Sequence, residues 1–299
     1  MLNEEIIENT ENFKRNPFER IGKVFKYEFI HASKTLIPLY AVLLLLGLLI
    51  GLLSNPLSQY TNNIFDEENS FHYEFNYDSR TATPEQNLAV KKSIILFGLT
   101  IAFSIFATAI FIITIVILAR RFKKSMLEDE AYLNLTLPVT IGEHLWGRFL
   151  SDLAWIIICF LVFTASFSLC LIRNHSLPWI SQGLSKLNYM IQDNNYSPVL
   201  FYFQIALSYL VNSSLIILFV FAINSIAHIN QKHEILTKII SAVVLIIIAS
   251  KADQLVFRFT GEDLGFIKTL WISTAVNFAL CTGCFGITHF IFAKNLNLE

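Results

Sequence analysis

The sequence of 299 residues is 54% hydrophobic and only 15% charged, with a formal net charge of -1. This composition is too apolar for an ordinary soluble domain, and the charge pattern offers no basic patch away from the apolar runs that could hold nucleic acid. It predicts an all-α, polytopic membrane protein. We expect a cytosolic N-terminus over residues 1–34, followed by a six-helix transmembrane domain over residues 35–293.

From Pro17 onward the sequence predicts an amphipathic helix of about 18 residues at the membrane surface. Apolar residues recur at helical spacing on one side, while Arg20, Lys23 and Lys34 are among the residues opposite. The apolar side comprises Phe18, Ile21, Phe25, Phe29 and Ala32. Such a helix fits two roles: it can rest on anionic headgroups, or it can dock a cytosolic partner or gate a pathway.

Six apolar runs are long enough to cross a bilayer, which takes about 20 residues of helix. The expected spans are about 35–53, 93–118, 149–172, 198–226, 235–257 and 269–292. In the first span, Gly47 and Gly51 have GxxxG spacing, which allows two helices to approach closely. The fifth run is interrupted by polar residues from Ser250 onward, so both a full crossing and a re-entrant turn within 235–268 fit it.

Two polar loops are expected on the outer side of the membrane. In the loop 54–92, aromatic and polar residues alternate over positions 71–78, which predicts a small extracellular β-like segment. The loop 173–197 has one apolar helical face, which predicts a short helix on the outer surface with Trp179 as an anchor. That face comprises Ile180, Leu184, Leu187 and Ile191.

The polar segment 120–148 lies between the second and third spans and carries strong local signals. Basic residues at its start mark the cytosolic side: Arg120, Arg121, Lys123 and Lys124. A short acidic helix is expected next, and Pro138 ends it because proline cannot continue the hydrogen-bond ladder. Thr140 and Glu143 form a capping box, which predicts a new helix running through Trp146 and Arg148 into the third span.

Polar side chains within the spans are few. Asp152 lies near the cytosolic start of the third span, where it can stay hydrated or pair with Arg148 four residues earlier. In the fourth span, hydrogen bonds to neighbouring helices are expected for Gln204, Asn212, Ser213 and Ser214. This scarcity of charge argues against an ion-coupled carrier, in which such groups mark the pathway.

The sequence shows no catalytic constellation. It contains no GxxxxGK[ST] phosphate loop, no HExxH and no GxSxG. Cys281 and Cys284 have CxxC spacing, but they lie in an apolar run, where small packing residues are expected rather than metal ligands. We therefore expect no catalytic residue, metal site or cofactor in this chain.

Positive charge predicts the orientation of the chain. With six spans, 14 of the 22 Lys and Arg residues fall in the segments on the side of the N-terminus. Because Lys and Arg are enriched in cytosolic loops, both termini are expected in the cytosol.

The central segment resembles the first cytoplasmic loop of ABC-2 type ABC-transporter permeases. Bacterial members of that family carry a segment similar to F-x-x-x-M-x-x-x-E-A-Y-L-x-x-T-L-P-V before a helix that enters the third span. The matching positions here are Phe122, Met126, Glu130, Ala131, Tyr132, Leu133, Thr136, Leu137, Pro138 and Val139. The layout of an interfacial helix and six spans also agrees, whereas the length of the loop 54–92 departs from it.

This resemblance implies a permease subunit of the bacterial cytoplasmic membrane that exports an amphipathic peptide, lipid or drug. It would pair with a second permease chain, identical or different, and a separate nucleotide-binding ATPase subunit would hold ATP and Mg and drive transport through the segment 120–148. The implied coupling residues are Met126, Leu127, Glu128, Asp129, Glu130, Tyr132 and Pro138, and the implied gate-helix residues are Phe18, Ile21, Phe25 and Phe29.

The alternative is a membrane scaffold or sensor subunit that docks a cytosolic partner without transport. Association with a P-loop ATPase separates the two hypotheses.

Overall fold

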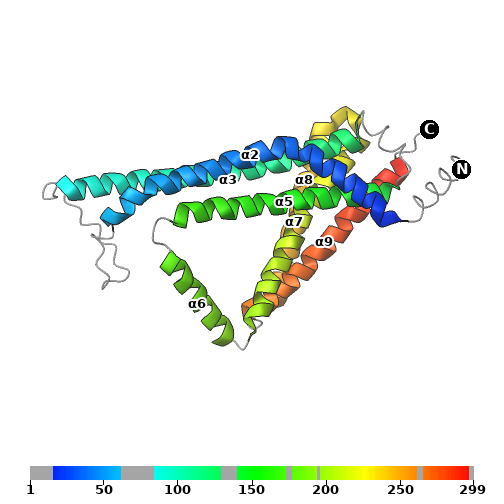
Figure 1. The fold of residues 1–299 in the computed structure, drawn as a ribbon. Coiled ribbons are helices and arrows are strands. Elements are labelled where there is room, and N and C mark those ends of the chain that lie inside the picture. The colour runs from blue at the N-terminus through cyan, green and yellow to red at the C-terminus, as the bar shows by residue number, and fades with distance from the viewer. Residues whose placement is uncertain are drawn as a thin grey trace, which may run out of the picture. The chain divides into compact units, whose positions relative to one another are not determined.

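The computed structural model describes residues 16–61, 84–128, 140–172, 177–193, 196–260 and 265–295. Within these ranges the secondary structure is helical, and Figure 1 shows the order of the helices. They are α2 (Pro17–Thr61), α3 (Pro84–Met126), α5 (Ile141–Ile172), α6 (Leu177–Asp193), α7 (Pro198–Ile229), the 3-10 turn η1 (Gln231–His233), α8 (Glu234–Thr260) and α9 (Gly265–Asn295). The expected β-like segment over 71–78 lies outside the described residues.

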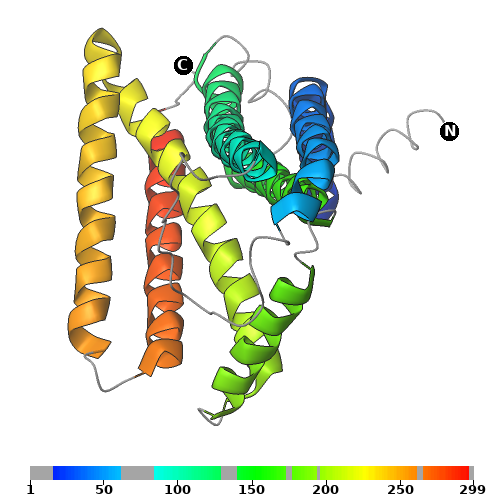
Figure 2. The same ribbon diagram turned by 90° about the vertical axis from the view of Figure 1, so that its left-hand side faces the viewer.

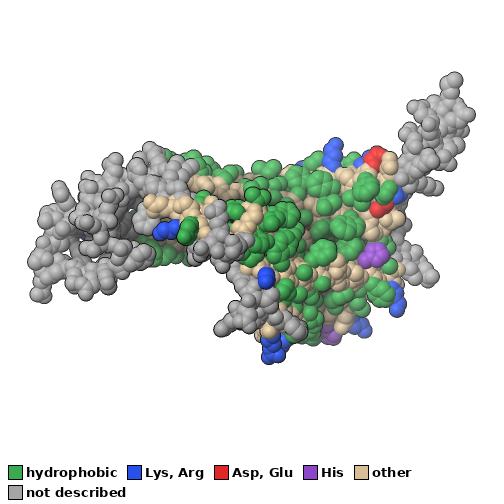
Figure 3. All heavy atoms as spheres, turned by 90° about the horizontal axis from the view of Figure 1, so that it is seen from below, with side chains coloured by type: hydrophobic (Ala, Val, Ile, Leu, Met, Phe, Trp, Pro, Cys, Tyr) green, Lys and Arg blue, Asp and Glu red, His purple; other side chains and the backbone are tan. Residues whose placement is uncertain are grey.

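Six helices are long and apolar enough to cross a membrane, as expected of a multi-pass membrane protein. Their membrane-length parts are Pro17–Leu52, Phe97–Met126, Ile141–Leu169, Pro198–Ile229, Glu234–Arg258 and Ile267–Lys294. Large apolar side chains remain exposed on these helices, and Figure 3 shows them spread over one face. On α8, Ile235 is 77% exposed and Phe257 is 79% exposed. Such surfaces are unfavourable in water and suit a lipid environment.

The N-terminal helix differs from the expected separate interfacial helix. α2 is one continuous helix from Pro17 to Thr61, so residues 17–34 and the first span form a single element. The two sides of the helix are also not buried and exposed as expected. Phe18 of the expected apolar side is 85% exposed, whereas Arg20 of the opposite side is largely buried. The cause is tertiary: Arg20 has an acidic partner on another helix, which the periodicity of α2 alone does not reveal.

The capping box expected before the third span is present. α5 begins at Ile141 behind the expected capping box: the backbone N–H of Thr140 donates to Glu143 Oε2 at 2.9 Å, and the backbone N–H of Glu143 donates to Thr140 Oγ1 at 3.3 Å. α3 runs without a break to Met126, so the start of the expected acidic helix continues the second span.

Two other expectations concern the later helices. α8 is unbroken from Glu234 to Thr260, so Lys251 and Asp253 lie within a helix and no re-entrant turn occurs within that range. The short helix expected in the second outer loop is present as α6.

The described helices belong to two compact units. The first contains Met1–Lys34, Thr114–Ile157 and Ile191–Glu299, and the second contains Thr35–Ile113 and Ile158–Met190. Within the first unit, α7, α8 and α9 pack together, as Figure 2 shows. Its aromatic core places the ring of Phe122 on that of Phe221, with centroids 4.0 Å apart, and edge-on to Phe292.

In the second unit, the first-span part of α2 approaches α5 closely. A Cβ atom added at Gly47 would lie 2.7 Å from the carbonyl oxygen of Ser166. The absence of a side chain at Gly47 therefore permits this contact, as the GxxxG spacing indicates.

Candidate functional site

The segment 120–148 begins in α3 and ends in α5, and three of the seven expected coupling residues are described. Met126 is fully buried and Leu127 is 7% exposed. Glu128 is exposed and forms an ion pair of 2.8 Å with Lys123. The other four, Asp129, Glu130, Tyr132 and Pro138, lie outside the described residues. Of the described three, only Glu128 presents its side chain to the surface.

Lys123 connects the end of α3 to the start of α8. Besides Glu128, its ammonium group contacts Glu234 Oε1 at 2.9 Å, and Glu234 also pairs with Lys238 at 2.8 Å. All four side chains are partly exposed, so each pair contributes only about 0–1 kcal/mol. The pair with Lys123 therefore orients the Glu128 side chain but contributes little to the stability of the fold.

Glu28 of α2 forms a buried polar cluster with α3 and α5. Arg121 Nη2 donates to Glu28 Oε2 and to the Glu28 backbone carbonyl, both at 2.7 Å. Arg148 Nη1 donates to Glu28 Oε1 at 2.9 Å and also to the hydroxyl of Ser125. We call Glu28, Arg121, Ser125 and Arg148 the Glu28 cluster. It joins α2 to both helices that flank the central segment.

A second ion pair joins the same helices nearer the start of α5. Arg20 Nη2 donates to Glu143 Oε1 at 2.6 Å, and both side chains are largely buried. The other carboxylate oxygen of Glu143 accepts from the backbone N–H of Thr140. Glu143 thus caps α5 and holds α2 at the same time.

Close packing accompanies these ion pairs. A Cβ atom added at Gly147 of α5 would lie 2.8 Å from Val24 Cβ and 3.0 Å from the carbonyl oxygen of Ile21. The ring of Phe29 stacks on that of Trp155, with centroids 4.7 Å apart. The first part of α2 and the start of α5 are therefore in close contact.

The four expected gate-helix residues have different surroundings. Phe29 stacks on Phe25 as well as on α5, whereas Phe18 is exposed and Ile21 is half-buried. Near Phe29 the expected apolar side of α2 packs against other residues of the chain, whereas near Phe18 it is exposed.

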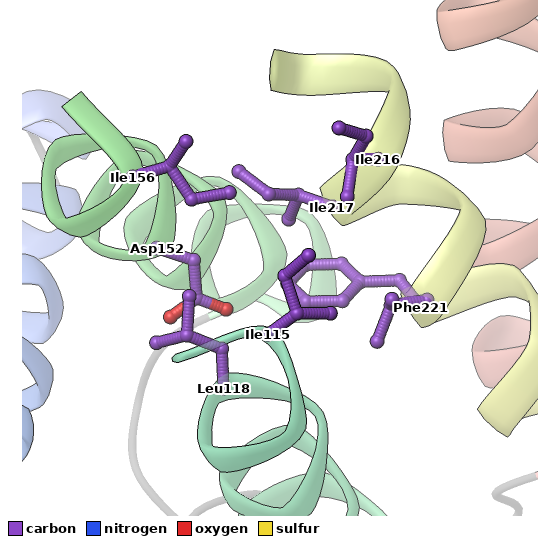
Figure 4. A pocket seen from close by; sticks show the side chains of 8 residues that line it. Ile115, Leu118, Asp152, Ile156, Ile216, Ile217 and Phe221 are labelled. Carbon is purple, nitrogen blue, oxygen red and sulfur yellow. The ribbon is translucent and has the colours of Figure 1, made fainter. Parts of the chain in front are cut away.

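Asp152 is buried and does not pair with Arg148, although that pairing was one of the two states expected from the sequence. The residue is 2% exposed and makes no salt bridge among the described residues, because Arg148 donates to Glu28 and Ser125 instead. Asp152 lines a small cavity between α3, α5 and α7, which Figure 4 shows. The other lining residues are Ile115, Leu118, Ile156, Ile216, Ile217, Val220 and Phe221.

Two polar residues of α7, Gln204 and Asn212, form the expected hydrogen bonds to a neighbouring helix, α9. Gln204 Nε2 donates to Thr274 Oγ1 at 3.0 Å, and Asn277 Nδ2 donates to Asn212 Oδ1 at 3.0 Å. Ser214 bonds instead to a carbonyl of its own helix. These contacts form a polar seam between two membrane-length helices.

Sequence reasoning missed the role of Glu28. It lies 93 residues from Arg121 and 120 residues from Arg148, so no helical spacing connects them. Glu28 lies four residues from both Val24 and Ala32, so it shares a helix face with them. Both of these residues are buried in the structure, and this shared apolar face is the signal that could have indicated a buried acid.

The chain matches no family model, no curated protein and no solved structure. Within the described ranges, His, Cys, Asp and Glu form no group that could hold a metal ion.

Proposed function

We propose that this chain is the permease subunit of an ABC transporter, driven by a separate ATPase subunit that contacts the segment 120–148. The resemblance of that segment to ABC-2 permeases motivates the proposal. In the proposed assembly, two permease chains and two ATPase subunits move an amphipathic peptide, lipid or drug across the cytoplasmic membrane.

The observation that carries the proposal is the Glu28 cluster. It binds α2 to the last turns of α3 and the first turns of α5, which are the two ends of the proposed coupling segment. Removing one partner of such a buried ion pair typically costs about 3–5 kcal/mol, so the three helices resist separation. A displacement of the segment by a partner would therefore move α2 with α3 and α5 rather than distort a loop.

The charge of the segment supports an ATPase contact. Glu128 is exposed, and Asp129 and Glu130 follow it in the sequence, so this stretch carries three consecutive acidic residues that suit a basic groove on a partner. In this proposal the open Phe18 end of α2 lies at the cytosolic membrane surface and responds to the same displacement.

The test is affinity purification from the native host in mild detergent, with mass spectrometry and an ATPase assay of the eluate. The wild-type chain should bring down a P-loop ATPase. Reversal of Glu128, Asp129 and Glu130 to Lys should lower its recovery at least about tenfold, corresponding to about 1.4 kcal/mol of lost binding.

The matched control is Asp253→Lys, which reverses an exposed acid on α8. Recovery of the ATPase should be unchanged in this variant. If the triple reversal leaves both ATPase recovery and ATP turnover intact, this coupling segment is not the contact. Purification with a kinase or structural protein and without ATP turnover would replace the permease with the scaffold or sensor function.

A further inference from the structure

Asp152 is a buried carboxyl group that no hydrogen-bond donor of the described chain reaches. The residue is 2% exposed, and Oδ2 has no hydrogen-bond partner within the described ranges. Figure 4 shows its carboxyl group among the apolar side chains that line the cavity. An ionised carboxylate is unfavourable among apolar side chains when protein donors do not replace its solvation.

The charged groups that act on Asp152 come from three helices: Glu28 of α2, Arg121 of α3 and Arg148 of its own helix. α7 contributes only apolar side chains to the cavity. Both guanidinium groups donate to Glu28. Because Arg148 lies four residues before Asp152 on the same helix, the surroundings of the carboxyl group depend on where Arg148 is bonded.

The cavity limits what Asp152 can bind. It has room for about one water molecule. A divalent metal ion takes about six to eight oxygen ligands, whereas this lining offers one carboxyl group among seven apolar residues. A proton needs only the one carboxyl group, so it is the ligand that this lining can bind.

We propose that Asp152 is a proton-binding site whose occupancy is controlled by the Glu28 cluster. The carboxyl group holds a proton while Arg148 is bonded to Glu28, and releases it when that bond opens. This inference goes beyond the proposed transport function and requires no ATPase partner.

The release step follows from the spacing of the residues. Arg148 precedes Asp152 by four residues on α5, so the two side chains can meet on one helix face once Arg148 leaves Glu28. The carboxyl O–H bond then breaks, the electron pair stays on the oxygen, and the proton passes to a water molecule. The resulting carboxylate is stabilised by the guanidinium group that Glu28 held before.

The test is infrared spectroscopy of the full chain in lipid nanodiscs during a pH titration. The wild type should show the C=O band of a neutral carboxylic acid at neutral pH, and Asp152→Asn should lack it. Asp253→Asn, which removes an exposed acid on α8, should retain it. In Glu28→Gln, the pH at which the band is half lost should fall by about 1–3 units, because Arg148 becomes available to Asp152.

Identical spectra of the wild type and Asp152→Asn would overturn the proton site. An unchanged titration of the band in folded Glu28→Gln would overturn its control by the Glu28 cluster. If Glu28→Gln does not fold, Glu28→Asp keeps the charge but shortens the side chain, which weakens its bond to Arg148. Folded Glu28→Asp should shift the titration in the same direction, and an unshifted titration would overturn the control.

Discussion

Gly47 shows how much a single residue can decide in this chain. The helices α2 and α5 of the second unit approach so closely there that the nearest neighbour of an added Cβ would be a backbone oxygen, that of Ser166. A backbone atom cannot rotate away as a flexible side chain can. The two helices would have to separate to admit even a methyl group.

We predict that Gly47→Ala lowers the free energy of unfolding by about 1–3 kcal/mol, the usual cost of overpacking. Gly98→Ala on α3 is the matched control, because nothing lies within 4 Å of its added Cβ. That variant should be unchanged or more stable by about 0.5–1 kcal/mol, because alanine favours helix. Denaturant titration in detergent micelles measures both, and equal stability of the two variants would contradict the close approach.

Residues whose signal is local could be predicted from the sequence, whereas residues whose partners are remote could not. Thr140 and Glu143 are three residues apart, so their capping box could be inferred before any tertiary structure was known. Arg148 was assigned Asp152 as a possible partner because they are four residues apart. Its observed partner, Glu28, is 120 residues away and is brought near only by the packing of α2 on α5.

At the scale of elements, the seam between α7 and α9 shows how polar groups join membrane-length helices. Gln204 is fully buried, and its amide donates to Thr274 Oγ1. Ser208 Oγ lies 2.7 Å from the same threonine oxygen. In an apolar environment these groups have few alternative partners, so they fix the register of one helix against the other.

A double-mutant cycle tests this seam. Gln204→Leu and Thr274→Val should show a coupling of about 0.6 kcal/mol, with about 1.7 kcal/mol as the upper end for such pairs in membranes. The control cycle uses Ser214→Ala and Thr282→Val, whose hydroxyls bond to carbonyls of their own helices. Unfolding of the single and double variants gives the coupling. Strictly additive effects at Gln204 and Thr274 would contradict an energetic link.

The helices could be predicted from the length and periodicity of the apolar runs, but whether neighbouring helical segments join into one helix could not. Hydropathy predicted all six membrane-length helices, because an apolar run of that length has few other stable states. The pattern also divided α2 into an interfacial helix and a span, although the chain continues as one helix from Pro17 to Thr61. Amphipathicity indicates which faces are apolar, but it cannot show whether a helix bends between them.

For the whole molecule, an even number of crossings returns the chain to the side on which it began. If the six membrane-length helices each cross once, both termini lie on the same side. The excess of Lys and Arg in the segments on that side predicts that it is the cytosolic side.

We predict that epitope tags at both termini are protected from protease in intact cells and become accessible after permeabilisation. A tag within the loop 54–92 should be cleaved in intact cells, and it serves as the control for the opposite side. Cleavage of one terminal tag in intact cells would mean that one of the six helices does not cross. The fifth, α8, would be examined first, because only 11% of its most apolar stretch is buried.

The Glu28 cluster also sets an order of events during biosynthesis. Arg148 leaves the ribosome 120 residues after Glu28, which at about 5–20 residues per second is a delay of roughly 6–24 s. Glu28 lacks both of its guanidinium partners until Arg121 is made 93 residues later, and it lacks Arg148 for the whole interval, so water must solvate its carboxylate. The beginning of α2 can therefore complete the Glu28 cluster only after the start of α5 has been synthesised, although α2 is the first of the described helices to be made.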